Sequence, residues 1–286
     1  MKKQNRETYF TSKDGQKLFF QSWEPPNPEY GILVTHGQGE HSGSYGQLLQ
    51  AFAQENCAIY SFDLRGHGRS EGIRGYAKNC FEYLNDFEAF LDFVLAFEKK
   101  PKKLFLFGDS MGGLVQLLCQ TQDRFIKYYR PLFHAQILTS PLTEVAVAVP
   151  RWKSDAAKMM NKIFPHLTLG NEIEDSMLTR DPLILQGYKQ DPLRHKKISS
   201  GVFLSFSEVF QVFEQEIQKI NLPTLLLIPE NDLVVSSPKS SELFARFQSA
   251  DKMKVVIPEA KHELINDLCR EEVFQTMKGH IQKWIL

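Results

Sequence analysis

An apolar run that stops at a glycine–serine turn constrains this chain more than any other feature. Residues 104–107 are Leu-Phe-Leu-Phe, and Gly108-Asp-Ser-Met-Gly112 follows at once. Glycines two positions before and after Ser110 allow close backbone approach where a Cβ would clash. A strand that enters a helix through G-x-S-x-G is typical of a nucleophile elbow. Chance alone gives this motif in roughly one chain of fifteen at average residue usage. The rest of the sequence must therefore decide whether the motif marks a nucleophile elbow.

Strand-length apolar runs alternate with helix-length amphipathic segments along the chain. Short, nearly continuous apolar runs are typical of parallel strands that are covered on both faces. The alternation predicts an α/β fold: a mostly parallel, eight-stranded sheet with helices on both faces. The expected strands are 8–12, 17–23, 31–35, 58–62, 103–107, 135–139, 224–228 and 252–257, and the expected helices are 83–97, 114–119, 238–247 and 271–285.

One stretch, residues 141–205, interrupts this alternation. It holds prolines, a tryptophan and short helical pieces, but no clear strand. It is too long for a structureless loop in a compact domain. We therefore expect residues 141–205 to form a helical cap, inserted into a core of residues 1–140 and 206–286. The alternative is a pair of ordinary connecting helices packed on the core.

The composition excludes several classes of function. The 34 basic and 34 acidic residues cancel, so no basic patch predicts nucleic-acid binding. The four cysteines are far apart and have no zinc-ligand spacing, which indicates free buried thiols and no metal site. The N-terminus lacks the apolar part of a signal peptide, and no apolar run approaches the ~20 residues of a membrane span. We expect a cytoplasmic protein, with peripheral contact to a membrane and the oligomeric state left open.

A serine hydroxyl needs a base to take its proton and a third group to orient that base. On an α/β-hydrolase scaffold the acid follows the serine along the chain, and the histidine comes last. Asp232 follows the apolar run 225–228, and His262 follows the run 252–257. Loops at the carboxyl ends of strands carry the sites of open α/β sheets. We predict that Ser110 is the nucleophile, His262 the base and Asp232 the acid.

Two other residues fit the required order. Glu230 is the alternative acid, but it lies closer to its strand and helps to shape the turn. His280 is the alternative late histidine. It lies within a helical pattern, so we expect it on the surface.

Acyl transfer also needs hydrogen-bond donors for the oxyanion of the tetrahedral intermediate. On this scaffold one donor is the backbone N–H after the nucleophile, here that of Met111. The other comes from the loop after the strand 31–35, where Gly37 and Gly39 flank Gln38. We predict the backbone N–H of Gln38 as the second donor.

The chain resembles the monoacylglycerol lipase and lysophospholipase branch of the α/β-hydrolases, often labelled serine aminopeptidase-like. The likeness covers nearly the whole chain, and the H-G-x-G-E-H-S combination is specific to the branch. The segments that carry it are His36-Gly-Gln-Gly-Glu-His-Ser-Gly43, Asp63-Leu-Arg-Gly-His-Gly-Arg-Ser70, Gly108-Asp-Ser-Met-Gly-Gly113, Arg180-Asp-Pro182 and Tyr188-Lys-Gln-Asp-Pro-Leu193. We interpret Asp63 and Arg65 as structural residues that brace their turn.

Three positions depart from the family pattern. The residue before the serine is usually His, whereas here it is Asp109. Its carboxylate either raises the pKa of His262, since a nearby negative charge favours imidazolium, or points away and caps the turn. The resemblance implies substrate-binding positions at Ser44, where the family often has Arg, at Ile184, where it usually has Glu, and at Tyr188. The loss of both polar anchors affects glycerol recognition and leaves the hydrolytic residues intact.

These observations predict a serine carboxylic-ester hydrolase that acts on lipid monoesters through an acyl-enzyme, as a lysophospholipase or monoacylglycerol lipase does. No metal or organic cofactor is expected. Apolar cap residues such as Trp152 and Met159 favour a lipid substrate and a place at a lipid interface. The alternatives are a small-ester esterase, a catalytically silent lipid-binding protein, and a proline-type aminopeptidase. The last of these needs an acidic anchor in the cap, for which the candidates are Glu172, Glu174 and Asp175.

Overall fold

The structure, a computed structural model, describes residues 4–146 and 150–285. An eight-stranded sheet forms its centre, in the order β1-β2-β4-β3-β5-β6-β9-β10. β2 pairs antiparallel with β1 and with β4, and the remaining neighbours pair parallel, which confirms the predicted sheet. The strands are β1 (Gln4–Thr11), β2 (Lys17–Glu24), β3 (Tyr30–Thr35), β4 (Cys57–Phe62), β5 (Lys103–Asp109), β6 (Phe133–Thr139), β9 (Thr224–Pro229) and β10 (Lys252–Ile257).

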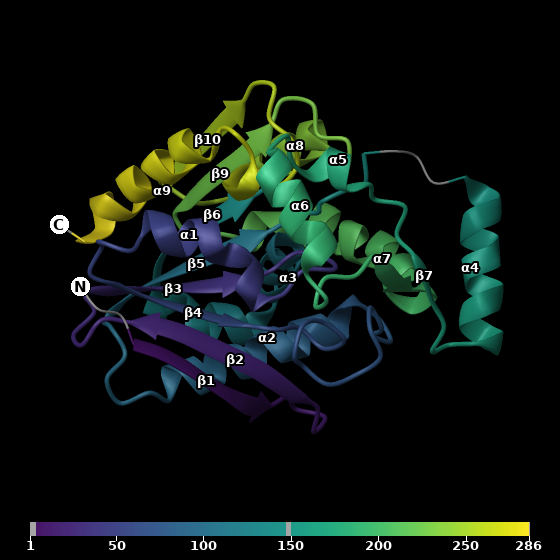
Figure 1. Ribbon diagram of the computed structural model, residues 1–286, viewed down its shortest axis with the longest axis horizontal. Coiled ribbons are helices and arrows are strands. Elements are labelled where there is room, and N and C mark those ends of the chain that lie inside the picture. Colours follow the sequence, from purple (N-terminus) through teal and green to yellow (C-terminus); the bar gives the residue numbers. More distant parts are fainter. Residues whose placement is uncertain (1–3, 147–149, 286) are drawn as a thin grey trace.

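Helices cover both faces of the sheet (Figure 1). α1 (Gly46–Ala51) and α9 (Arg270–Ile285) pack on one face, and α2 (Cys80–Leu95), α3 (Met111–Gln120), α7 (Ser200–Glu216) and α8 (Ser237–Ala245) pack on the other. Successive side chains of a strand point to opposite faces, so Leu104 and Leu106 of β5 enter one core while Phe105 and Phe107 enter the other. Short helical turns complete the connections: η1 (Ser42–Tyr45), η2 (Phe125–Tyr129), η3 (Arg130–Leu132), η4 (Ile217–Lys219) and η5 (Leu264–Asn266).

The connection from β6 to β9 leaves the sheet, and Figure 1 places its first helix farthest from the centre. It contains α4 (Arg151–Ile163), β7 (Thr168–Gly170), α5 (Asp175–Leu178), α6 (Pro182–Gln190) and β8 (Lys197–Ser199). β7 and β8 pair as a small antiparallel sheet, so the expectation of no strand between residues 141 and 205 is wrong. Residues 147–149 of this connection lie outside the described residues.

The predicted cap boundary at residue 205 falls inside α7. This helix buries Val202, Phe206 and Val209 in the same core as α2 and α3, and it also packs against α4 of the outer elements. We propose that the cap runs from the end of β6 to β8. Among the described residues, no helix is long and apolar enough to span a membrane.

The position of His280 in α9 contradicts the expectation that this histidine lies on the surface. Its side chain is 2 % exposed rather than on the surface, and burial lowers its pKa to about 4. It lies on the buried face of α9 with Met277 and Ile281. It is therefore a core histidine.

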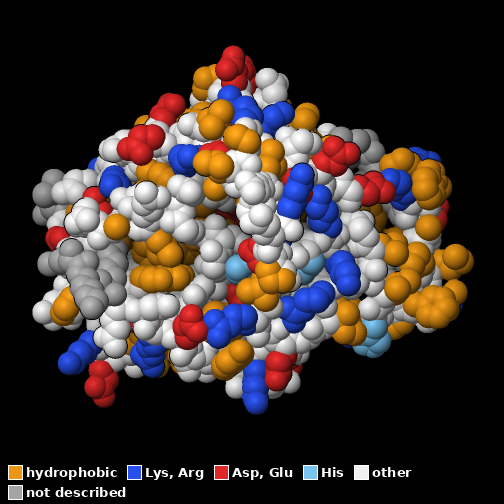
Figure 2. Space-filling model, in the orientation of Figure 1, with side chains coloured by type: hydrophobic (Ala, Val, Ile, Leu, Met, Phe, Trp, Pro, Cys, Tyr) orange, Lys and Arg blue, Asp and Glu red, His pale blue; other side chains and the backbone are white. Residues whose placement is uncertain are grey.

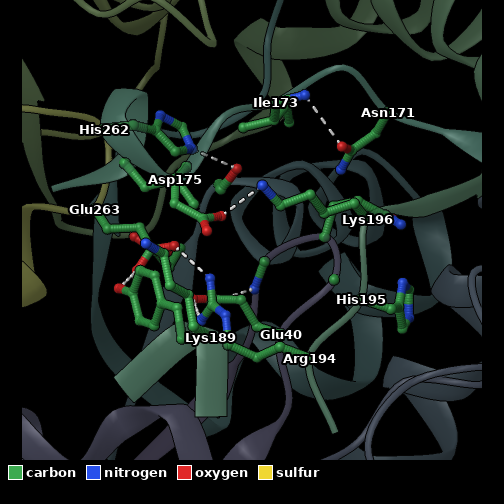
Figure 3. Close-up of a pocket in the computed structure, with 17 residues that line it drawn as sticks. Glu40, Asn171, Ile173, Asp175, Lys189, Arg194, His195, Lys196, His262 and Glu263 are labelled. Carbon is green, nitrogen blue, oxygen red and sulfur yellow. Dashed lines mark hydrogen bonds and ion pairs between the residues drawn. The ribbon is translucent and has the colours of Figure 1, made fainter. Parts of the chain in front are cut away.

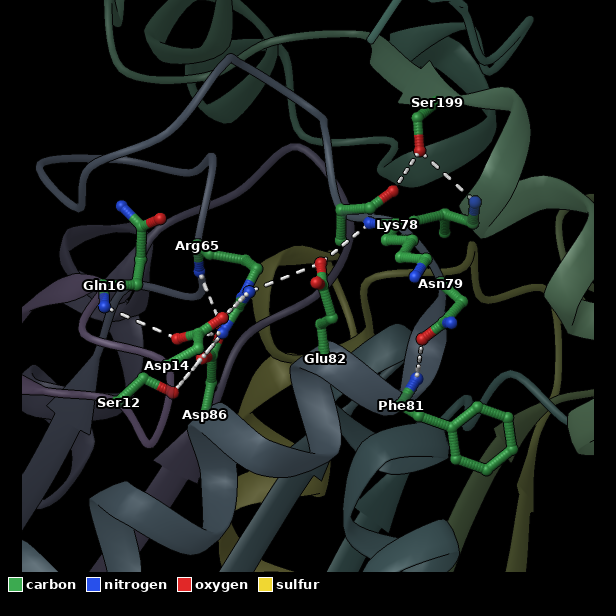
Figure 4. A network of polar contacts seen from close by, with 12 residues as sticks. Ser12, Asp14, Gln16, Arg65, Lys78, Asn79, Phe81, Glu82, Asp86 and Ser199 are labelled. Carbon is green, nitrogen blue, oxygen red and sulfur yellow. Dashed lines mark hydrogen bonds and ion pairs between the residues drawn. The ribbon is translucent and has the colours of Figure 1, made fainter. Parts of the chain in front are cut away.

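A buried ionic network joins three segments that are far apart in the sequence (Figure 4). Arg65, in the turn after β4, contacts Asp86 of α2 through Nη2 (2.6 Å) and Nε (2.8 Å). Its Nη1 contacts Asp14 in the β1–β2 turn at 2.7 Å, and Ser12 Oγ donates to Asp86 at 2.7 Å. Asp63 accepts the backbone N–H groups of Ser42 and Arg69. These contacts confirm the interpretation of Asp63 and Arg65 as structural residues.

Candidate active site

Ser110 lies in the tight connection between β5 and α3. It has φ +48°, in the left-handed region that non-glycine residues rarely occupy. A Cβ on Gly112 would lie 2.0 Å from the carbonyl oxygen of Thr35, so only glycine lets α3 start this close to β3. A Cβ on Gly108 would lie 2.9 Å from the Cα of Gly113. The sequence therefore folds locally as the elbow that G-x-S-x-G predicted.

The structure brings the three predicted catalytic side chains into one line. Ser110 Oγ lies 2.8 Å from His262 Nε2, and His262 Nδ1 lies 2.8 Å from Asp232 Oδ2. The side chains of His262 and Asp232 are 3 % and 0 % exposed, so water does not compete for these contacts. Asp232 Oδ1 also accepts the N–H groups of Val234 and Val235. The alternative acid, Glu230, is exposed.

Several carboxylates act on His262. Burial opposes its charge, but the charge and hydrogen bond of Asp232, followed by the charges of Asp109 and Glu263, raise the pKa of His262 to about 9. Burial likewise opposes the charge of Asp232, yet His262 and the two backbone donors lower the pKa of Asp232. The pair is therefore held in the orientation in which Asp232 fixes the imidazole.

Asp109 lines the cavity beside Ser110, and its charge contributes to the raised pKa of His262. Its side chain accepts a hydrogen bond from Thr139 Oγ1 of β6. Burial raises the pKa of Asp109 well above its ordinary range, the charge of Glu40 adds to this, and His262 opposes it. Of the two roles considered for Asp109, the structure favours an electrostatic effect on His262.

The two predicted oxyanion donors come from adjacent loops. Met111 is the first residue of α3, where a backbone N–H has no partner within the helix. Gln38 lies in the loop after β3 and lines the same cavity as Ser110. An ideal Cβ on Gly37 would lie 3.2 Å from Ser110 Cβ, so this loop packs against the elbow. The arrangement fits a developing oxyanion between the two loops.

A cavity of about 220 Å³ opens at Ser110 and His262 (Figure 3). Most of its lining residues have polar or charged side chains, although apolar atoms form the larger part of the exposed surface. Besides Ser110 and His262, the lining residues are Gly37, Gln38, Gly39, Glu40, Asp109, Asn171, Ile173, Asp175, Leu178, Tyr188, Lys189, Arg194, His195, Lys196 and Glu263. In the described part of the chain, no group of three His, Cys, Asp or Glu side chains could hold a metal ion.

Of the three predicted substrate-binding residues, only Tyr188 lines the cavity. Ser44 Oγ accepts the backbone N–H of His41 as part of the capping box of η1. Ile184 lies one turn before Tyr188 on α6 and does not line the cavity. The roles predicted for Ser44 and Ile184 gain no support from the cavity and stay predictions.

Sequence reasoning missed several charged residues of the cavity wall, among them Arg194 and the two carboxylates that it contacts, Glu40 and Glu263. Arg194, from the cap, contacts Glu40 Oε1 at 3.1 Å and Glu263 Oε1 at 2.9 Å. Its guanidinium carbon lies 3.7 Å from the ring centroid of Tyr188. Glu40 belongs to the H-G-x-G-E-H-S segment and Glu263 follows the predicted base, so both positions carried a signal. Arg194 carried none, because only the fold brings the cap against both loops.

Comparisons with known proteins agree with this geometry. A family model described as serine aminopeptidase, S33, matches residues 26–269. The chain belongs to this family. Monoglyceride lipase of Homo sapiens is 31 % identical over 97 % of this chain and 89 % of its own length. An abhydrolase domain-containing protein of Dictyostelium discoideum is 30 % identical over 96 % of this chain, which spans 28 % of that protein. The crystal structure of Paleococcus ferrophilus monoacylglycerol lipase superposes on this S33-family chain with a TM-score of 0.79, 28 % identity, and coverage of 93 % and 98 %.

Proposed function

We propose that the protein is a serine hydrolase that cleaves lipid monoesters through an acyl-enzyme. The observation that carries this proposal is the line of hydrogen-bonding contacts from Ser110 through His262 to Asp232, which ends in a cavity. A nucleophile that touches its base, and a base held by a buried acid, are the requirements for acyl transfer. The similarity to the human monoglyceride lipase and to the Paleococcus monoacylglycerol lipase supports an ester of a lipid.

The reaction proceeds in two steps. His262 Nε2 takes the proton of Ser110 while Ser110 Oγ attacks the ester carbonyl, and Asp232 stabilises the resulting imidazolium. The N–H groups of Gln38 and Met111 bind the oxyanion. His262 returns the proton to the alcohol oxygen, which leaves with it. Water then attacks the acyl-enzyme, with His262 as base, and releases the acid and Ser110.

Replacement of the nucleophile tests the proposal. Ser110→Ala should abolish ester hydrolysis and labelling by a fluorophosphonate probe, since no other group carries the attack. Thr143→Ala, which removes a buried hydroxyl outside the cavity, should retain both. Labelling of the Ser110→Ala variant at the wild-type rate would contradict the proposal. A wild-type protein that the probe never labels would support the silent lipid-binding alternative.

The substrate class has a separate test. The charged and polar side chains around the cavity suit the alcohol part of an ester, and the apolar cap suits an acyl chain. We expect p-nitrophenyl esters with medium or long acyl chains to react faster than p-nitrophenyl acetate, at concentrations below micelle formation. A strict preference for acetate would indicate a small-ester esterase. A panel of monoacylglycerols and lysophospholipids, with Ser110→Ala as blank, separates the two head-group classes.

Contact with a membrane surface is part of the proposal. The cap exposes a group of large apolar side chains, which lies at the outer edge of the molecule (Figure 2). The group comprises Trp152, Met159, Ile163, Phe164, Leu167 and Leu169. Trp152, Met159 and Ile163 recur at helical spacing on α4, and Lys153, Lys158 and Lys162 lie between them. An amphipathic basic helix of this kind lies in a lipid interface.

Vesicle flotation tests this contact. The triple variant Trp152→Ser, Met159→Ser, Ile163→Ser should bind vesicles of phosphatidylcholine and phosphatidylglycerol less than the wild type, because it removes apolar area from the interface. Leu183→Ser is the matched control, since Leu183 is the most exposed large apolar residue of the other long cap helix, α6. Equal binding by the triple variant and the wild type would contradict the membrane proposal.

The aminopeptidase alternative requires a free carboxylate for the substrate amine. Asp175 lines the cavity, but it pairs with Lys196 at 2.7 Å. Glu172 is exposed and pairs with Lys153, and Glu174 does not line the cavity. Because Asp175, which alone of these three acids lines the cavity, is paired with a cation, we favour the esterase. Hydrolysis of an aminoacyl anilide faster than that of a lipid ester would reverse this choice.

A further inference from the structure

The cap returns to the core through residues 194–197, and this short segment lies on the predicted oxyanion loop, residues 37–40. His195 N donates to Gly39 O at 3.0 Å, and Gln38 Nε2 donates to Lys197 O at 2.7 Å. Gly39 has φ +77°, and a Cβ there would lie 2.1 Å from His195 O. The two backbones are therefore in direct contact, and glycine is required for it.

Arg194 extends this contact to the charged groups around the site. Its side chain is 12 % exposed, and its two partners, Glu40 and Glu263, are 5 % and 4 % exposed. Glu40 Oε2 accepts the N–H of Gly37 at 2.9 Å and the hydroxyl of Tyr45 at 3.1 Å. The carboxylate that Arg194 holds therefore also fixes the backbone one residue before Gln38.

The second partner connects Arg194 to the base. Glu263 follows His262 directly, and its other oxygen accepts Asn266 Nδ2 at 2.9 Å and the hydroxyl of Tyr188. Although burial opposes it, the Arg194 cation lowers the pKa of Glu263. Burial and the charge of Glu263 raise the pKa of Glu40, and Arg194 opposes this rise. One guanidinium thus separates two buried carboxylates on two different loops (Figure 3).

We propose that Arg194 is a positioning residue that links the seated cap to the oxyanion loop and the histidine loop. The inference rests on the proposed function and adds a dependence of the chemical step on the cap. Without the guanidinium, Glu40 and Glu263 would face each other as uncompensated buried charges, which is strongly destabilising in comparable pairs. The loop that carries Gln38 would then relax, and its N–H would lie away from the developing oxyanion.

The test uses p-nitrophenyl butyrate, because its leaving group needs no head-group recognition. Loss of one oxyanion donor typically lowers kcat by 10²–10³, so displacement of one by Arg194→Met should lower kcat by about 10-fold. KM should change by less than about twofold, because the effect arises in the transition state. Arg194→Lys, which retains the charge but not the fork of two donors, should restore part of kcat.

The matched control is Arg270→Met. Arg270 also joins core and cap, through a 2.7 Å contact with Asp181 at the start of α6. Its contact with the histidine loop is with the backbone oxygen of Asp267, five residues after His262, and it contacts neither of the two carboxylates that Arg194 holds. It should retain kcat within about twofold of the wild type. If Arg270→Met lowered kcat as much as Arg194→Met does, the loss of any contact between cap and core would lower kcat. That result would overturn the role of Arg194.

A double-mutant cycle with Glu40→Gln identifies the route. If Arg194 acts through Glu40, Arg194→Met should add little to Glu40→Gln. The double variant also removes one of the two buried charges that Arg194→Met leaves without a partner. Additive losses would overturn that route. A wild-type protein without hydrolysis or probe labelling would refute the proposed function, whereas an active wild type with an equally active Arg194→Met would refute this inference alone.

Discussion

At the scale of single residues, Asp109 distinguishes this site. It places a third carboxylate, with Asp232 and Glu263, in the field of His262. A negative charge near a histidine stabilises imidazolium, whereas a general base must be neutral to accept a proton. The carboxylates that surround His262 and stabilise its charged form therefore also limit the pH range in which His262 is available as a base.

The pH profile of ester hydrolysis should reflect this. The pKa of His262 is raised to about 9, so kcat/KM should rise as pH increases through that value and fall below it, where His262 holds its proton. Asp109→Asn removes one of the charges that favour imidazolium. We expect its inflection at lower pH than that of the wild type, measured with a soluble p-nitrophenyl ester.

Glu230→Gln provides the control for this experiment. Glu230 is an exposed carboxylate two residues before Asp232, so solvent screens its charge, and its removal should leave the inflection in place. An unchanged inflection in Asp109→Asn would show that Asp109 carries no charge that His262 senses. A shifted inflection in Glu230→Gln would return Glu230 to consideration as the acid.

At the scale of elements, the β5–α3 connection has no room for a side chain larger than hydrogen at Gly112. Gly112→Ala should lower the free energy of unfolding by about 3 kcal/mol, because the new methyl group would overlap the backbone of Thr35. It should also lower activity, since Thr35 leads into the loop of Gln38. Urea unfolding followed by circular dichroism measures the first effect.

Gly187→Ala is the matched variant in the cap helix α6. An ideal Cβ at Gly187 meets nothing within 4 Å, and alanine favours a helix over glycine by about 1 kcal/mol. Its stability should therefore equal or exceed that of the wild type. If the two variants unfolded at the same urea concentration, the steric account of the elbow would be wrong.

The elements differ in how well the sequence predicted them. The eight strands were predictable, because a short continuous apolar run between turn residues is typical of a buried parallel strand, and the helices after them have apolar residues at a clear period. α7 was missed. Its segment has eight large apolar residues spread around the helix, with serines and β-branched residues of lower helix propensity, so no single stripe identifies it. Packing on α2, α3 and α4 determines it instead.

At the scale of the whole molecule, the network around Arg65 joins the β1–β2 turn, the turn after β4 and α2. Asp86→Ala should destabilise the fold by about 3 kcal/mol, because Arg65 would keep a buried charge without its main partner. Thermal and urea unfolding measure this loss.

Glu242→Ala serves as the reference for an exposed pair. Glu242 contacts Lys239 at 2.9 Å on the surface, and exposed pairs contribute about 0.5 kcal/mol. Equal losses in the two variants would contradict a structural role for the Arg65 network.

The candidate site was predictable where chain order determines it. Ser110, Asp232 and His262 follow the order that the scaffold requires, and each follows an apolar strand. Two features of the cavity wall were not predictable: Arg194 belongs to it, and Ser44 and Ile184 do not. Both depend on how a cap of short elements sits on the core. No periodic pattern in a sequence encodes such a contact. A rotation of α6 by one residue about its axis would change which of its side chains face the cavity.

The site is assembled from loops after β3, β5, β9 and β10, and this separation has a consequence for synthesis of the protein. Ser110 and His262 are 152 residues apart. At ~5–20 residues per second, the ribosome adds His262 roughly 8–30 seconds after Ser110. Throughout that interval the nascent chain holds the proposed nucleophile without its proposed base. The polypeptide therefore stays catalytically silent until its last parallel strand has joined the sheet, and hydrolysis reports the end of folding rather than its beginning.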